Sequence, residues 1–76
     1  MNREPASLII WVVYDRPTDF PDAFVARKWD MDRPTAEVLT ADTLAEIRKK
    51  VRAALPGGVM MLRSTLDDPK IVETWL

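Results

Sequence analysis

The sequence predicts a two-layer α+β domain, in which one helix lies on one face of a mainly antiparallel sheet of four or five strands, in the order βββαββ. Three observations predict this class. Residues 8–14 are apolar at every position, as in a strand that is covered on both faces. Only residues 43–55 have apolar side chains at helical spacing. The other apolar runs are short and are bounded by proline, glycine and aspartate.

The first strand, 8–14, divides into two apolar faces. Leu8, Ile10, Val12 and Tyr14 make one face, and Ile9, Trp11 and Val13 make the other. One helix can cover only one of them, so the second face needs a long loop, a second copy of the chain or another partner.

Residues 15–22 form a connector, because two prolines and three aspartates favour turns and prolines lack a ladder donor. A second strand, 24–29, follows and pairs with the first as an antiparallel hairpin. It places Phe24, Ala26 and Lys28 on one side and Val25, Arg27 and Trp29 on the other. Residues 35–40 are a weaker third strand. If they are irregular, the order is ββαββ, which is compatible with a β-grasp arrangement.

The helix is predicted by its cap and its apolar stripe. Thr43 and Glu46 fit a capping box, and Pro56-Gly57-Gly58 ends the helix. The stripe consists of Leu44, Ile47, Val51 and Leu55. The cations are expected mostly on the open side, namely Arg48, Lys49, Lys50 and Arg52.

Two strands close the chain, at 59–63 and 71–76, with a turn at Asp67-Asp68-Pro69 between them. A right-handed crossover through the helix would make the third and fourth strands parallel. One end of the domain would then be acidic, with Asp15, Asp19, Asp22, Asp42, Asp67 and Asp68. Cations would lie toward the other end, namely Arg3, Arg33, Lys49 and Arg52.

The composition favours association. A single domain of 76 residues, 1–76, buries only about 60% of its unfolded surface and needs a further stabilising device. The chain has no cysteine for a disulfide, and it has neither cysteine nor histidine for zinc. No segment approaches the roughly 20 apolar residues of a membrane span, and we expect a cytoplasmic protein. A net charge of −1 predicts no general attraction to nucleic acid or anionic lipid.

The residue types offer little chemistry. Without histidine or cysteine there is no imidazole base and no thiolate, so we expect no enzyme, no cofactor and no metal. The carboxylates that could act together are Asp67 with Asp68, Asp30 with Asp32, and Asp15 with Asp19 and Asp22. Each group lies in a predicted turn, where aspartate ordinarily caps its own loop.

Most of the chain resembles a family of short, uncharacterised bacterial and phage-associated proteins. We know of no activity that is assigned to this family. The resemblance is carried by Val13-Tyr14-Asp15, Asp19-Phe20-Pro21-Asp22, residues 24–29, Ala41-Asp42-Thr43-Leu44, Asp67-Asp68-Pro69 and residues 71–75. It implies a recurrent small domain and transfers no functional residue.

We therefore expect a non-enzymatic interaction domain that self-associates as a homodimer through an aromatic sheet face; another protein is the other possible partner. Tryptophan is enriched at interface centres. The expected face, on the helix-free side, comprises Ile9, Trp11, Val13, Trp29 and Trp75. In a competing arrangement the tryptophans lie under the connector, with Phe20 as a lid.

The alternative function is a module for single-stranded nucleic acid, in which aromatic side chains stack on bases beside cations of the second strand. Its contact residues would be Phe24, Arg27, Lys28 and Trp29.

Overall fold

The computed structural model describes residues 8–31, 33–62 and 70–76, apart from the side chain of residue 62. The elements follow the predicted order βββαββ. They are β1 (Ile9–Asp15), β2 (Phe24–Asp30), β3 (Arg33–Ala41), α1 (Leu44–Ala54), β4 (Met60–Leu62) and β5 (Ile71–Trp75). Because residues 33–41 form a strand that pairs with β2, the shorter order ββαββ does not apply.

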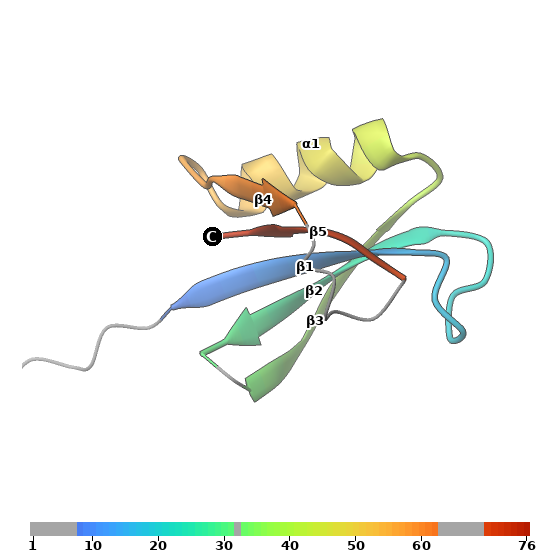
Figure 1. The fold of residues 1–76 in the computed structure, drawn as a ribbon, viewed down its shortest axis with the longest axis horizontal. Helices are drawn as coiled ribbons and strands as arrows, with labels where there is room; N and C mark the ends of the chain where they lie inside the picture. Colours follow the sequence, from blue (N-terminus) through green and yellow to red (C-terminus); the bar gives the residue numbers. More distant parts are fainter. Residues whose placement is uncertain (1–7, 32, 63–69) are drawn as a thin grey trace, which may run out of the picture.

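One five-stranded sheet has the order β3-β2-β1-β5-β4, with α1 on one face (Figure 1). All neighbouring strands are antiparallel, including the predicted hairpin of β1 and β2. It follows that β3 and β4 run in the same direction at opposite edges, as the crossover predicts. β1, the strand that is apolar on both faces, lies at the centre of the sheet.

The helix packs as its sequence predicts, and the Thr43 half of the predicted capping box marks its start. The Thr43 hydroxyl accepts a hydrogen bond from the Glu46 N–H at 3.1 Å, which satisfies one of the free donors at the helix start. Ile47 and Val51 are fully buried, and Leu44 and Leu55 pack against the same core.

The core between α1 and the sheet corrects the expected placement of the tryptophans. Trp11, Val13 and Trp75 are buried in this core, and Ile9 packs against it. The helix therefore covers the odd-numbered face of β1, not the even-numbered one. Ala26 and Ala41 belong to the same core, and their small side chains let α1 approach the sheet closely. The expectation of a helix-free face centred on Trp11 was wrong.

Trp29 does lie on the helix-free face. Its neighbour Lys28 is the cross-strand partner of Trp11 and shares the helix-covered face with it, and successive residues of a strand point to opposite faces. The connector contacts this face through Asp19, which forms an ion pair with Arg27. The Arg27 guanidinium also lies 5.8 Å from the centre of the Tyr14 ring. Phe20 remains 37% exposed, so it does not act as the lid of the competing arrangement.

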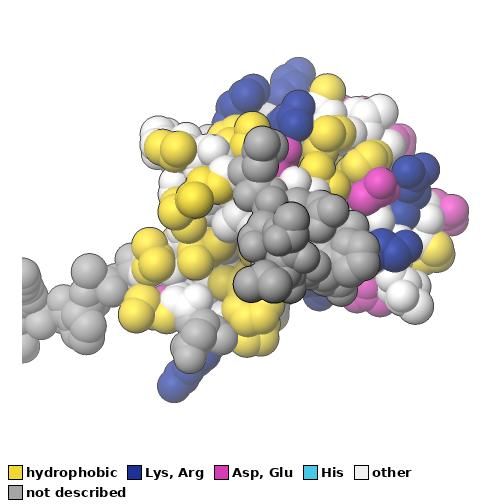
Figure 2. All heavy atoms as spheres, viewed as in Figure 1, with side chains coloured by type: hydrophobic (Ala, Val, Ile, Leu, Met, Phe, Trp, Pro, Cys, Tyr) yellow, Lys and Arg dark blue, Asp and Glu magenta, His cyan; other side chains and the backbone are white. Residues whose placement is uncertain are grey.

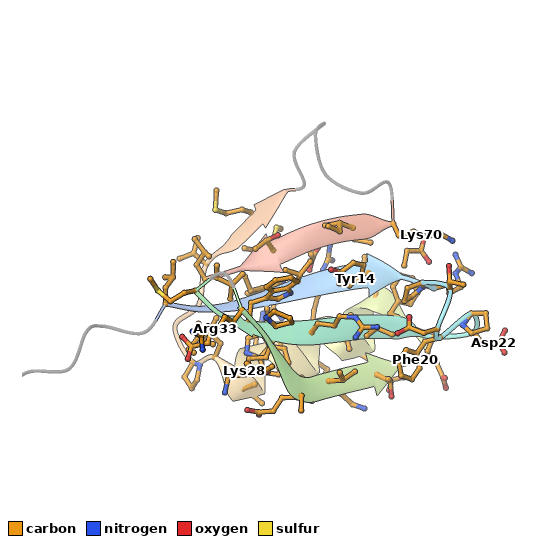
Figure 3. The ribbon with its side chains drawn as sticks, turned by 90° about the horizontal axis from the view of Figure 1, so that it is seen from below. Tyr14, Phe20, Asp22, Lys28, Arg33 and Lys70 are labelled. Atoms are coloured by element: carbon orange, nitrogen blue, oxygen red, sulfur yellow. The ribbon has the colours of Figure 1, made fainter. Side chains whose placement is uncertain are left out.

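The connector and Lys70, which precedes β5, lie at one end of the sheet, as predicted, and Arg33 lies at the other. Figure 3, seen toward the helix-free face, shows Phe20, Asp22 and Lys70 at one end and Arg33 at the other. The connector end is not simply acidic, however. The Asp15 carboxylate contacts Arg16 at 2.6 Å, and Asp19 pairs with Arg27. Asp67, Asp68 and Arg3 lie outside the described residues.

Candidate interaction surface

The carboxylates form no metal centre in the part of the chain that the structure describes, where no group of three or more potential ligands occurs. Asp15 and Asp19 are engaged with arginines, as ordinary turn aspartates can be. Asp32, Asp67 and Asp68 fall outside the described residues, so their pairs are not placed.

The most perturbed carboxylate is Glu73, which the sequence did not single out. It lies on β5 and is fully buried. The Arg48 guanidinium of α1 binds it in a bidentate manner, with Nη2 at 2.8 Å from Oε1 and Nε at 3.0 Å from Oε2. The Trp75 indole N–H donates to Oε2 at 2.9 Å. These three donors satisfy a charge that would otherwise be costly to bury.

Two opposing effects act on the pKa of Glu73. Burial raises it, but hydrogen bonds from Arg48 and Trp75, together with the charges of Arg48 and Arg52, bring it below its usual value. Glu73 is therefore ionised at neutral pH and cannot serve as a general base that is poised near pH 7. The arrangement instead fastens α1 to β5.

Lys49, Lys50 and Arg52 are exposed, which agrees with the expectation that the helix cations lie mostly on the open side, whereas Arg48 is half-buried. Three of the four cations nevertheless contact the sheet. Arg48 binds Glu73, and Arg52 lies 5.4 Å from the centre of the Trp75 ring. The Lys50 ammonium donates to the Thr40 carbonyl at 2.6 Å. Arg48, Lys50 and Arg52 thus help to hold α1 against the sheet.

The residues of the nucleic-acid alternative do not share one surface. Phe24 and Lys28 lie on the helix side, where Phe24 packs against the core, whereas Arg27 and Trp29 lie on the opposite face. Both cations already have acidic partners: Lys28 contacts Glu37 at 2.8 Å, and Arg27 contacts Asp19. No continuous strip of aromatic and basic groups results.

A different surface stands out by its exposed apolar side chains. Seven large hydrophobic residues are exposed among the described ones, and all but Phe20 gather at the end of the sheet opposite the connector. We call this surface the apolar end. Its residues are Leu8, Met31, Val59, Met60, Met61 and Leu76, with exposed fractions between 38% and 64%.

Backbone hydrogen bonds bring these distant segments together. The Met31 N–H donates to the Leu8 carbonyl at 2.8 Å, which joins the turn between β2 and β3 to the start of β1. Val59 and Leu76 exchange two bonds, at 2.8 and 3.0 Å, beside the pairing of β4 with β5. Trp75 is opposite Trp11, so the end of β5 also lies beside the first half of β1.

Figure 2 shows the same division of the surface. Hydrophobic side chains gather on the side of β4 and the start of β1, and most charged side chains lie elsewhere. Three of the six residues are methionines, whose flexible side chains adapt to the shape of a partner. The arrangement suits binding of another apolar surface better than chemistry.

Sequence reasoning missed this surface because its members lie at strand ends and turns, away from the periodic segments. One signal was present: residues 59–62 are four consecutive apolar residues with no polar alternation, in a segment that follows two glycines. A strand with one solvated face would alternate.

No family model, curated protein or solved structure matches the chain. In the described residues, no helix is long and apolar enough to cross a membrane.

Proposed function

We propose that this chain is a non-enzymatic interaction domain that self-associates through the apolar end. The observation that carries the proposal is the gathering of six exposed large hydrophobic side chains at one end of the sheet. A monomer seldom leaves so many large apolar side chains exposed at one end, and burying them in an interface is favourable in proportion to the apolar area removed.

Two further features support a binding role over a catalytic one. The chain has no histidine and no cysteine, and the described carboxylate with the clearest pKa perturbation holds two elements of the fold together. Self-association also supplies the stabilising device that a small core without disulfides needs. The cytoplasmic location expected from the sequence stays a prediction.

The proposal is tested by gel filtration with light scattering over a wide range of concentrations. We expect a mass above the 8.7 kDa of one chain, falling toward that value on dilution. Met60→Glu should shift the protein to the single-chain mass, because it places a charge in the interface. Phe20→Glu is the matched control, since Phe20 and Met60 are 37% and 38% exposed and lie at opposite ends.

Phe20→Glu should associate as the unaltered chain does. A single-chain mass for the unaltered protein at every concentration would refute self-association. Equal weakening by both substitutions would show that the apolar end is not the contact.

A further inference from the structure

The two open edges of the sheet, β3 and β4, differ in how they are protected against pairing with another strand. β3 carries Arg33, Pro34 and Glu37, and its pairing with β2 is interrupted by a register shift. The Lys50 ammonium additionally occupies the Thr40 carbonyl. Charges, a proline and an irregularity are the devices by which proteins block edge-to-edge association.

β4 has none of these features in its described part. Val59, Met60 and Met61 are exposed and uncharged, and residue 62 of the same strand is a leucine. Of these protective devices, the described residues show only a short length for β4, three residues. An uncharged edge of this kind is a template for another strand.

The hydrogen-bond pattern shows which backbone groups face outward. Val59 and Leu76 exchange both of their bonds, so they are a hydrogen-bonded antiparallel pair. Such pairs alternate with non-hydrogen-bonded ones. Met60 opposite Trp75 is therefore a non-hydrogen-bonded pair, and Met61 opposite Thr74 is a bonded one. The N–H and C=O of Met60 and Leu62 consequently point toward the open edge.

We propose that β4 pairs with β4 of a second copy of this chain, in antiparallel orientation and centred on Met61. This inference rests on the self-association proposed above and specifies its geometry. Only in this register is each of the three residues of β4 paired with a β4 residue of the second copy. It places Met60 opposite the partner's Leu62, so that the outward-facing groups of both strands are satisfied.

A second copy is the favoured occupant because the edge is self-complementary. The three residues of β4 carry no charge, so an antiparallel copy brings no like charges together. The two-fold axis runs perpendicular to the sheet, and the product is one continuous sheet of ten strands, five from each copy. Both helices then lie on the same face, and the helix-free faces become continuous.

The register predicts which single introduced cysteines can form a disulfide between two copies. The chain has no cysteine of its own, so any disulfide must involve the introduced residue. Met61 and Met61 of the partner subunit form a non-hydrogen-bonded pair, with Cβ atoms about 4.5–5.5 Å apart. Modest adjustment brings this distance into the range of a disulfide. Two Val59 residues are offset by four positions along the strands, roughly 13 Å, which is too far for a disulfide.

Met61→Cys should therefore form a disulfide-linked dimer in a glutathione redox buffer at least about tenfold faster than Val59→Cys. Val59 is the stricter control because it is the more exposed of the two, at 64% against 51%. Random collision would favour the Val59 variant, so equal rates or the reverse order would overturn the proposed register.

A second measurement tests the backbone itself. Chemical synthesis can replace the amide N–H of Met60 by an ester oxygen, which removes an outward donor and keeps every donor between β4 and β5. The Val59 carbonyl, which accepts from the Leu76 N–H, becomes a weaker ester acceptor, so the stability of the single chain is measured alongside. The dimer should weaken by about tenfold or more, because the donor is lost twice in a symmetric pair. The same change at Met61 removes a donor to β5 and only weakens the outward Met60 carbonyl, so it should mainly lower the stability of the single chain and weaken the dimer less than the ester at residue 60.

The outcomes separate this inference from the proposed function. A dimer that is weakened by Met60→Glu but unaffected by the ester at residue 60 would retain self-association and refute strand pairing. A single-chain mass at all concentrations would refute both. Pairing of β4 with an unrelated strand, with no dimer formed, would refute the second copy as occupant.

Discussion

Replacing Arg48 with methionine is expected to cost much more folding free energy than replacing its partner Glu73 with glutamine. The two side chains of this ion pair are unequally exposed: 36% for Arg48 and 1% for Glu73. Arg48→Met leaves a buried carboxylate that still accepts a hydrogen bond from the Trp75 N–H. Glu73→Gln leaves a guanidinium that water can reach.

The size of the Arg48→Met effect is limited by proton uptake. An unpaired buried carboxylate costs about 3–5 kcal/mol. Glu73 can instead take up a proton, which at pH 7 costs about 1.36 kcal/mol for each pH unit above its usual pKa of 4.5. The cost of the unpaired charge is therefore limited to about 3.4 kcal/mol at pH 7 and about 0.7 kcal/mol at pH 5, and the lost attraction of the ion pair adds to it.

Glu73→Gln should cost about 1 kcal/mol. Its amide oxygen still accepts from Trp75 or Arg48, and the arginine is exposed enough for its lost pairing to be largely offset by hydration. The double variant, Arg48→Met with Glu73→Gln, should be more stable than Arg48→Met alone at pH 7, because it contains no buried, unpaired charge.

Urea unfolding followed by tryptophan fluorescence measures these differences, since Trp11 and Trp75 are both buried. With a slope of about 1 kcal/mol per molar urea for a small domain, Arg48→Met should lower the midpoint by roughly 3 M at pH 7. The loss should shrink markedly at pH 5. All variants are compared at one protein concentration, because association shifts apparent stability.

Equal losses for Arg48→Met and Glu73→Gln would refute the reasoning. So would a loss for Arg48→Met that does not change between pH 7 and pH 5. Either result would mean that the Glu73 carboxylate is hydrated in the folded protein.

Two further predictions concern acid stability and the helix cap. The folded-state pKa of Glu73 lies below 4.5, so its contribution is fully present above that pH and is lost as the pH falls through the folded value. The urea midpoint of the unaltered protein should therefore fall more between pH 5 and pH 3 than that of Glu73→Gln, and parallel slopes would contradict this. Thr43→Ala should cost about 1 kcal/mol in the same assay, because the Glu46 N–H loses its acceptor, whereas Thr43→Ser should be nearly neutral. An equal cost for both substitutions would contradict the capping role.

The sequence by itself determined the elements and their order, because each has a local cause. Periodicity placed Ile47 and Val51 on the buried side of one helix, and Thr43 marked its start. Alternation divided the second strand into the faces that the structure has, with Ala26 on one side and Val25 on the other. These signals depend only on neighbours along the chain.

The sequence could not decide which face of β1 the helix covers. That strand is apolar on both sides, so its own pattern is satisfied by either choice. The covered side is the one where Ala26 and Ala41, from two other strands, leave room for α1. For this reason Trp11 and Trp75 were expected in an interface and are found in the core.

Only the tertiary structure revealed the Arg48–Glu73 pair and the apolar end. Arg48 and Glu73 are 25 residues apart, and nothing local marks a strand carboxylate as the partner of a helix cation. The six residues of the apolar end come from strand ends, a turn and a short edge strand. They become one surface because antiparallel pairing brings those ends together, and this pairing is a property of the whole sheet.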